Sequence, residues 1–263
     1  ELSSMYTSAG GIYEFSKHAY NRFFSFMMGW VALIVGNLST ALLVVAAINY
    51  LIPDPSQFWL KIIISIVFIV VLNLIAFFGV EFGALLLIVF AFIAISVLLS
   101  VILPGAFKID FDNYHPFFNY GFGPIFVAMF FLFESFFGWE SATYLAEETQ
   151  EPQRVIPKAI IIGTIIVGIL GIATAAVSLG VIPWRVLALS DTPLSIVSEQ
   201  TIGHFGVKLL NIGIFAALIG SAAGGIITMP RLILALARDK LFIAQLSHVH
   251  ERFKTPHKAI LFQ

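Results

Sequence analysis

Two acidic residues in an apolar segment are the strongest indication of a functional site in this sequence. Glu134 lies at the midpoint of the apolar stretch 122–146, and Glu140 follows it in the same stretch. An acidic residue at the centre of a membrane-spanning helix costs about 2.5–3.5 kcal/mol on insertion scales. A carboxyl removed from water can instead take up a proton. Glu134 therefore indicates a bound cationic group or a carried proton, with a structural hydrogen bond to another helix as the alternative.

The backbone around Glu134 is also weakened as a helix. Ser135 and Gly138 follow it, and Gly121, Gly123 and Pro124 stand at the other end of the stretch. Non-helical backbone at membrane depth is tolerated only against protein or a water-filled cavity. The two half-helices of such a break offer N–H groups to a carboxylate and carbonyls to a cation. A break at 135–138 could therefore hold a zwitterion such as an amino acid.

The elements that must position these residues are helices in a membrane. The 263 residues are 59% hydrophobic and 11% charged, and the mean hydropathy is +0.98. A spanning helix needs about 20 mostly apolar residues, and the apolar runs lack the period of two of an outer-membrane barrel. We predict an all-α integral membrane protein with one transmembrane transporter domain over residues 1–263. Its six predicted spans are residues 23–52, 57–78, 84–103, 122–146, 159–182 and 207–230.

Other classes of protein are disfavoured by what the sequence lacks. There is no cysteine, which removes disulfides, thiolate metal sites and a catalytic thiol. All histidines fall outside the predicted spans, which argues against haem, and no His-Glu-x-x-His zinc motif occurs. We expect no metal, no cofactor and no enzymatic activity. An ion channel is harder to exclude, although no filter-like loop or ring of charges is apparent.

The distribution of basic residues predicts the orientation. Ten of the 14 Lys and Arg residues gather on one side of the predicted spans, so loops 147–158 and 231–258 are expected to be cytoplasmic. In the first loop, Glu147, Glu148 and Glu151 lie near Arg154 and Lys158. These charges form either a solvated connector or an inside gate whose ion pairs break and re-form.

Polar and small residues interrupt two further predicted spans. Asn37 lies in the first, and Ser221, Gly224 and Gly225 belong to a run of small residues in the last. Such residues serve close helix packing and interhelical hydrogen bonds, or they let a backbone approach a bound substrate. Both interpretations stay open.

Several motifs resemble those of the amino acid-polyamine-organocation (APC) superfamily. SFFGWESA at 135–142 and EPQRVIPKA at 151–159 are similar to the sixth helix and the loop after it, AGGIYEF at 9–15 to the junction of helices two and three, and LARD at 236–239 to the segment after helix eight. The resemblance implies a LeuT-like fold of two inverted five-helix repeats and alternating access, with six complete helices present here, one of them discontinuous. It also implies that the chain is an internal fragment from the end of helix two to the start of helix nine, so that the first helix and its half of the site are missing.

The resemblance also assigns roles to residues. The GWESA form and Gly36-Asn37 are most similar to the basic amino acid and polyamine antiporter branch, in which Asn37, Ser135, Phe137 and Gly138 match substrate-lining positions. The expected substrate site comprises Asn37, Glu134, Ser135, Phe136, Phe137, Gly138 and Trp139. The expected coupling or gating residues are Glu140, Glu147, Glu148 and Arg154, and a cavity wall on helix eight is expected from Ser221, Gly224 and Gly225.

Two departures from the family pattern bear on substrate and coupling. An aromatic residue is usual at the position of Glu134, and the fifth helix has no lysine to replace a sodium ion. We predict a secondary transporter of amino acids or related amines in the cell membrane, with antiport and proton or sodium symport left open. Its expected partners are the small-molecule substrate and the lipid bilayer, without nucleic acid, and a homodimer stays open.

Overall fold

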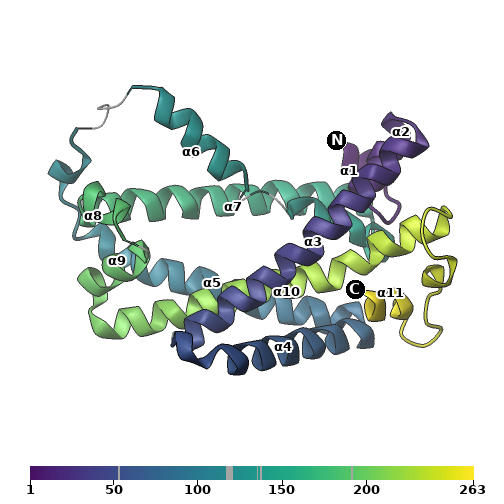
Figure 1. Cartoon of the computed structure of the whole chain (residues 1–263). Helices are drawn as coiled ribbons and strands as arrows, with labels where there is room; N and C mark the ends of the chain where they lie inside the picture. Colours follow the sequence, from purple (N-terminus) through teal and green to yellow (C-terminus); the bar gives the residue numbers. More distant parts are fainter. Residues whose placement is uncertain (53, 117–120, 135, 137, 191) are drawn as a thin grey trace. The chain divides into compact units, whose positions relative to one another are not determined.

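The computed structural model describes residues 1–52, 54–116, 121–134, 136, 138–190 and 192–263, and the regular secondary structure in these residues is helical (Figure 1). Within them, five helices are long and apolar enough to cross a membrane. These are α3 (Arg22–Leu51), α4 (Phe58–Phe78), α5 (Val80–Ala106), α7 (Pro152–Val181) and α10 (His204–Arg238). The expectation of an all-helical membrane protein is confirmed.

Local signals in the sequence set several helix ends. The side-chain oxygen of Asn21 accepts hydrogen bonds from the backbone N–H groups of Phe23 and Phe24, at 3.0 and 3.1 Å, and so caps α3. Between α4 and α5, Gly79 has φ 138°, a conformation that residues with a Cβ rarely adopt. The chain therefore turns between these two helices with a single residue.

The predicted span 122–146 is interrupted. The helix α6 (Gly123–Glu134) ends at Glu134, and the 3₁₀ helix η3 (Trp139–Glu148) begins after Gly138. Gly138 is left-handed, with φ 99° and ψ −16°, which stops a right-handed helix at this residue. Ser135 and Phe137 lie outside the described residues. The described part of the stretch thus has the interruption that its small residues predicted.

Two helices extend beyond the apolar runs into segments predicted as loops. The helix α7 begins at Pro152, because proline is tolerated where the first N–H groups have no partner within the helix. The helix α10 continues past Pro230 to Arg238. Arg154 therefore lies on the first turn of α7, and Arg231 and Arg238 lie on the last turns of α10. The expectation that these three residues lie in loops is wrong.

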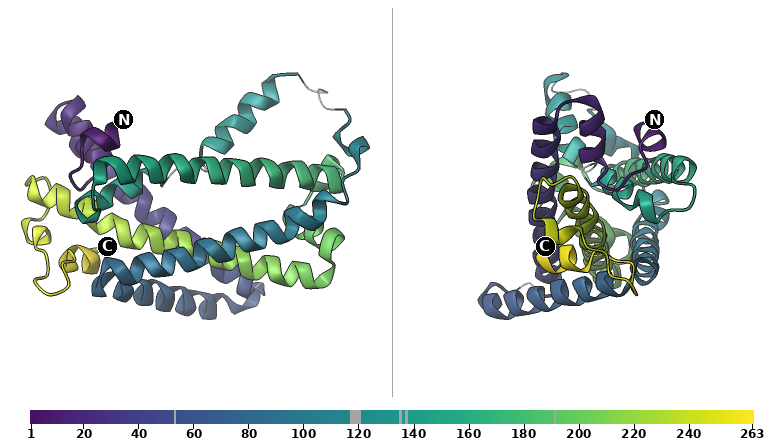
Figure 2. Two further views of the ribbon diagram at one scale, coloured as in Figure 1. Left: turned by 180° about the vertical axis from the view of Figure 1, so that it is seen from behind. Right: turned by 90° about the vertical axis from the view of Figure 1, so that its right-hand side faces the viewer.

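The chain forms two compact units, each considered by itself: unit 1 is residues 1–90, 138–162 and 218–263, and unit 2 is residues 91–137 and 163–217. In unit 1, α2 (Ile12–Ala19) packs on α3, α3 packs on α4, and α11 (His257–Phe262) packs on α4 and on η4 (Ala244–Ser247). The short α1 (Leu2–Met5), α2 and the segment 239–256 lie at one end of this unit (Figure 2).

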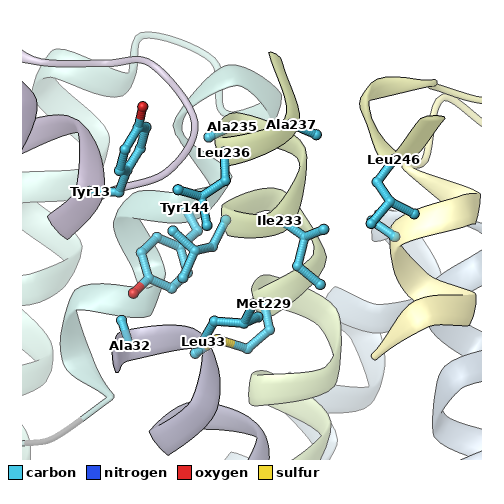
Figure 3. Close-up of a cluster of buried hydrophobic side chains, with 12 residues drawn as sticks. Tyr13, Ala32, Leu33, Tyr144, Met229, Ile233, Ala235, Leu236, Ala237 and Leu246 are labelled. Carbon is cyan, nitrogen blue, oxygen red and sulfur yellow. The ribbon is translucent and has the colours of Figure 1, made fainter. Parts of the chain in front are cut away.

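The core of unit 1 is built around the C-terminal part of α10. Leu236 lies against Tyr13 of α2 and Tyr144 of η3, and Leu33 of α3 lies beside Met229 (Figure 3). Tyr13 and Tyr144 are each at most 1% exposed. Because aromatic side chains bury large areas, this cluster fixes α2, η3 and α10 against one another.

Unit 2 holds α6, the larger part of α7 and the remaining parts of α5 and α10, with the short helices η2 (Phe111–Tyr114), α8 (Trp184–Ala188) and α9 (Pro193–Ile202). Val97, Val101, Val197 and Leu210 form its core. The ammonium of Lys108 donates to the carbonyls of Gln200 and Thr201, at 2.8 and 3.0 Å. That contact satisfies carbonyls at the end of α9, which have no partner within the helix.

Candidate functional site: the helix break and the charged end of unit 1

A carboxylate within η3 itself, that of Glu140, stabilises the start of this helix. The Glu140 carboxylate accepts a hydrogen bond from the Gly138 N–H at 2.9 Å. A carboxylate at a helix N-terminus is favoured by the helix dipole, so Glu140 acts as a local cap in this conformation. Trp139 is partly buried and Phe136 is 47% exposed. Glu134 is the last residue of α6, which places its backbone directly at the break.

Asn37 and the small residues of α10 differ in how closely other side chains surround them. The Asn37 amide donates to the Leu33 carbonyl of its own helix at 3.0 Å. A Cβ added at Gly225 would collide with Thr40 of α3, whereas one at Gly224 would have Leu87 as its nearest neighbour, at 3.9 Å. Close packing therefore explains Gly225. A cavity wall stays a prediction for Gly224 and for Ser221, which is exposed.

An ion pair with a buried guanidinium joins η3 to α10. The Arg231 guanidinium donates to Glu148 through Nε, 2.8 Å from Oε1, and through Nη2, 3.1 Å from Oε2. Its Nη1 donates to the Ile227 carbonyl. Arg231 is 1% exposed and the Glu148 side chain 25%. Since removing one partner of a buried pair leaves an uncompensated charge, this contact is costly to break.

A second ion pair between the same elements is half-exposed. Arg238 Nη1 lies 2.8 Å from Glu147 Oε2 and 2.9 Å from Oε1, and the side chains are 43% and 39% exposed. Glu147 Oε1 also accepts the Ala9 N–H at 3.1 Å. Burial opposes ionisation of Glu147, yet the hydrogen bonds from Arg238 and Ala9 prevail and lower the pKa of its carboxyl. Glu147 thus stays ionised and links three segments.

Asp239 forms a third contact point, between α2 and the end of α10. Its carboxylate accepts hydrogen bonds from the Tyr13 hydroxyl and the Lys17 ammonium, both at 2.6 Å. Its carbonyl accepts from Arg22 at 3.3 Å. Burial would raise the pKa of Asp239, but the bonds from Lys17 and Tyr13 lower it. Burial and the bond to Asp239 raise the pKa of Tyr13, so its hydroxyl remains a donor.

The charged loop therefore has partners other than those its sequence suggested. Arg154 lies 3.5 Å from Glu151, with side chains 79% and 71% exposed, and such surface pairs contribute little. The sequence did not mark Arg231 as a site residue, and it marked Arg238 and Asp239 only as part of the LARD motif, without a role in the site. One signal was available: Arg231 and Arg238 are seven positions apart, which places them on one face of a helix.

A polar cavity adjoins both ion pairs. It has a volume of about 350 Å³ and is bounded by η3, the end of α10 and the segment 249–256. Its charged lining residues are Glu147, Glu148, Arg231, Arg238 and Lys254. Two carboxylates face three cationic groups, which leaves one positive charge in excess.

Comparisons with known proteins agree with the membrane architecture. The family described as "Amino acid permease" matches residues 1–263. The Branched-chain amino acid permease BcaP of Bacillus subtilis (strain 168) is 25% identical over 284 residues, covering 100% of this chain and 60% of the relative. The Serine/threonine exchanger SteT of the same strain is 25% identical over 274 residues, covering 100% and 61%. Cationic amino acid transporter 9, chloroplastic, of Arabidopsis thaliana is 33% identical over 157 residues, covering 59% and 27%. The chain spans about 60% of the length of the two bacterial relatives.

Proposed function

Since this chain belongs to the amino acid permease family of the APC superfamily, we propose that the protein is a secondary transporter that moves amino acids or related amines by alternating access. Family membership implies a LeuT-like fold. The proposal assigns the five long helices and the discontinuous α6–η3 segment to helices three to eight of two inverted five-helix repeats. The known members of the family are permeases and not membrane enzymes.

The interruption between Glu134 and Gly138 is the observation that carries this proposal. An α-helix ends within an apolar stretch, and the chain resumes as a 3₁₀ helix after a left-handed glycine. Backbone groups freed at membrane depth need protein, water or a polar ligand as partners. A substrate with ammonium and carboxylate groups fits that need. The proposed site comprises Asn37 and residues 134–139, of which 135 and 137 lie outside the described residues.

The relatives support a shared recognition of the amino acid group. Their names specify branched-chain amino acids, serine and threonine, and cationic amino acids. These substrates share the α-ammonium and α-carboxylate and differ in the side chain. We propose that the broken backbone recognises the shared groups and that residues such as Glu134 select the side chain.

A basic amino acid or polyamine antiporter is the second candidate, and the acidic Glu134 favours it. A carboxylate at the break would attract a substrate with an extra positive charge. Its alternative role is to carry the coupling proton. Glu140, which caps η3 here, is the other candidate for coupling.

The cellular setting proposed is the cell membrane, with segments 147–158 and 231–258 on the cytoplasmic side. The bacterial relatives and the orientation predicted from basic residues support this. Plant relatives are named as vacuolar, mitochondrial and chloroplastic proteins, so the multi-pass architecture alone does not specify the membrane. A homodimer is compatible with this proposal.

Competition for uptake tests the function. Uptake of a labelled amino acid by the full-length protein in proteoliposomes would be measured in the presence of unlabelled arginine, lysine, putrescine, alanine or leucine. The proteins compared are the wild type, Glu134→Gln and a control, Glu199→Gln, which changes an exposed acidic residue of α9. Competition by the cationic compounds that is lost only in Glu134→Gln supports selection by this carboxylate. Competition by neutral amino acids that is unchanged in Glu134→Gln would refute it. Absence of any amino acid uptake would refute the transporter proposal itself.

A further inference from the structure

The two ion pairs between η3 and α10 differ in how easily they can open. The Glu147–Arg238 pair is about 40% exposed on both sides, so water can replace each partner. The Glu148–Arg231 pair is bidentate, and its guanidinium is 1% exposed. A state in which this pair is separated but the guanidinium stays buried would be disfavoured by roughly two orders of magnitude or more, the cost of leaving a buried charge without its partner. A conformational cycle would therefore open the first pair and keep the second.

Lys254 offers the released carboxylate another partner. Its side chain is exposed and lines the same cavity as Glu147 and Glu148. With the described residues, Lys254 makes no ion pair within 4.0 Å. The other two cationic groups of the cavity are already paired, so Lys254 supplies the positive charge in excess.

The backbone of Lys254 is held in place by the turn around it. Its φ is 54°, a left-handed conformation that is uncommon for lysine. Its N–H donates to the His250 carbonyl at 2.9 Å, and the His250 N–H donates to the Thr255 carbonyl at 2.8 Å. The fully buried Thr255 donates through its hydroxyl to the Phe77 carbonyl at the end of α4, at 3.0 Å. The base of Lys254 is thus anchored to α4 rather than to η3 or α10.

We propose that Glu147 is a partner-switching residue of the cytoplasmic gate: Arg238 and the Ala9 N–H hold its carboxylate in the conformation described here, and Lys254 receives it when the cavity opens. The Glu148–Arg231 pair stays closed in both states and keeps η3 attached to α10. This inference rests on the proposed transport function and adds Arg238 and Lys254 as positioning residues. A two-state element needs such alternative contacts, because an opening that only removed contacts would be disfavoured.

Thiol labelling in the full-length transporter tests the switch without relying on uptake. The chain contains no cysteine, so Leu234→Cys provides a reporter; Leu234 is 4% exposed and lines the cavity. The reporter would be labelled from the cytoplasmic side with a membrane-impermeant maleimide, any cysteine elsewhere in the protein having been replaced. Faster labelling then reports a more open cavity.

Neutralising the two cationic partners should have opposite effects. Arg238→Gln removes the closed partner, so labelling should accelerate about two- to fivefold, the range expected for a surface pair. Lys254→Gln removes the open partner, so labelling should slow by a similar factor. In a Glu147→Gln background, Lys254→Gln should have no effect. Lys258→Gln, which changes another exposed lysine of this region, serves as the control.

Two outcomes would overturn the switch: Lys254→Gln labels like the control, or it slows labelling equally when Glu147 is already neutral. Should Arg238→Gln fail to fold, Arg238→Lys retains the charge and should label close to wild type, and the Lys254 arm still decides. Labelling needs no substrate, so loss of the switch is distinguishable from failure of the transporter proposal, which would appear as absent uptake by the unmodified protein.

Discussion

The Glu148–Arg231 pair allows an asymmetric prediction about stability. Glu148→Gln leaves the guanidinium of Arg231, which is 1% exposed, without a counter-charge. Removing one partner of a buried pair destabilises by roughly 3–5 kcal/mol, and the 25% exposure of the Glu148 side chain favours the lower end, about 3 kcal/mol. Arg231→Met leaves a carboxylate that water can reach, so its cost should be smaller, about 1–2 kcal/mol.

The double variant Glu148→Gln/Arg231→Met should recover much of the loss. A neutral pair leaves no buried charge unpaired, and replacing both partners of a buried pair is often nearly neutral. We therefore expect the double variant to be destabilised by about 2–3 kcal/mol less than the sum of the two single effects, at the upper end of coupling energies for contacting residues.

The assay is reversible unfolding of the full-length protein in mixed micelles, followed by tryptophan fluorescence. Glu151→Gln is the matched control, since Glu151 and its partner Arg154 are more than 70% exposed. Equal effects of Glu148→Gln and Arg231→Met that add to within about 0.5 kcal/mol in the double variant would contradict the asymmetric cost of this pair.

Three further predictions concern single positions. The pKa of Asp239 is lowered by its partners against the effect of burial, so its contribution to stability should be present above its unfolded pKa, about 3.9, and be lost as pH falls through the lower folded value. Acid unfolding curves should therefore show a smaller loss below about pH 4 in Asp239→Asn than in wild type, and equal losses would contradict this. Gly138→Ala places a side chain at φ 99° and should destabilise by about 1–2 kcal/mol, whereas Gly171→Ala, in the middle of α7 with open space around it, should be neutral or stabilising; chemical unfolding that ranks them in reverse would refute the assignment. Gly225→Ala should lower the thermal stability more than Gly224→Ala, because only the first adds a Cβ that meets Thr40, and equal melting temperatures would count against close packing there.

Much of the helical framework is readable from the sequence because its causes are local. Hydropathy over about 20 residues determines whether a segment can span a bilayer, and the predicted spans 23–52 and 57–78 differ from α3 and α4 by one residue at most at each end. Ser135 and Gly138 predicted an interruption, and α6 ends at Glu134. The helix ends that lie in charged segments were harder to predict, since α7 and α10 continue into segments that hydropathy assigns to loops.

The partners of the charged residues were decided only by the tertiary structure. Glu147 and Glu148 lie beside Arg154 in the sequence, yet they pair with Arg238 and Arg231. Ion pairing depends on distance and burial in three dimensions, and sequence proximity fixes neither. The packing role of Gly225 likewise depends on where α3 passes α10. The sequence alone determined that the protein spans a membrane with an interrupted helix, whereas the folded arrangement determined which charges hold η3 against the end of α10.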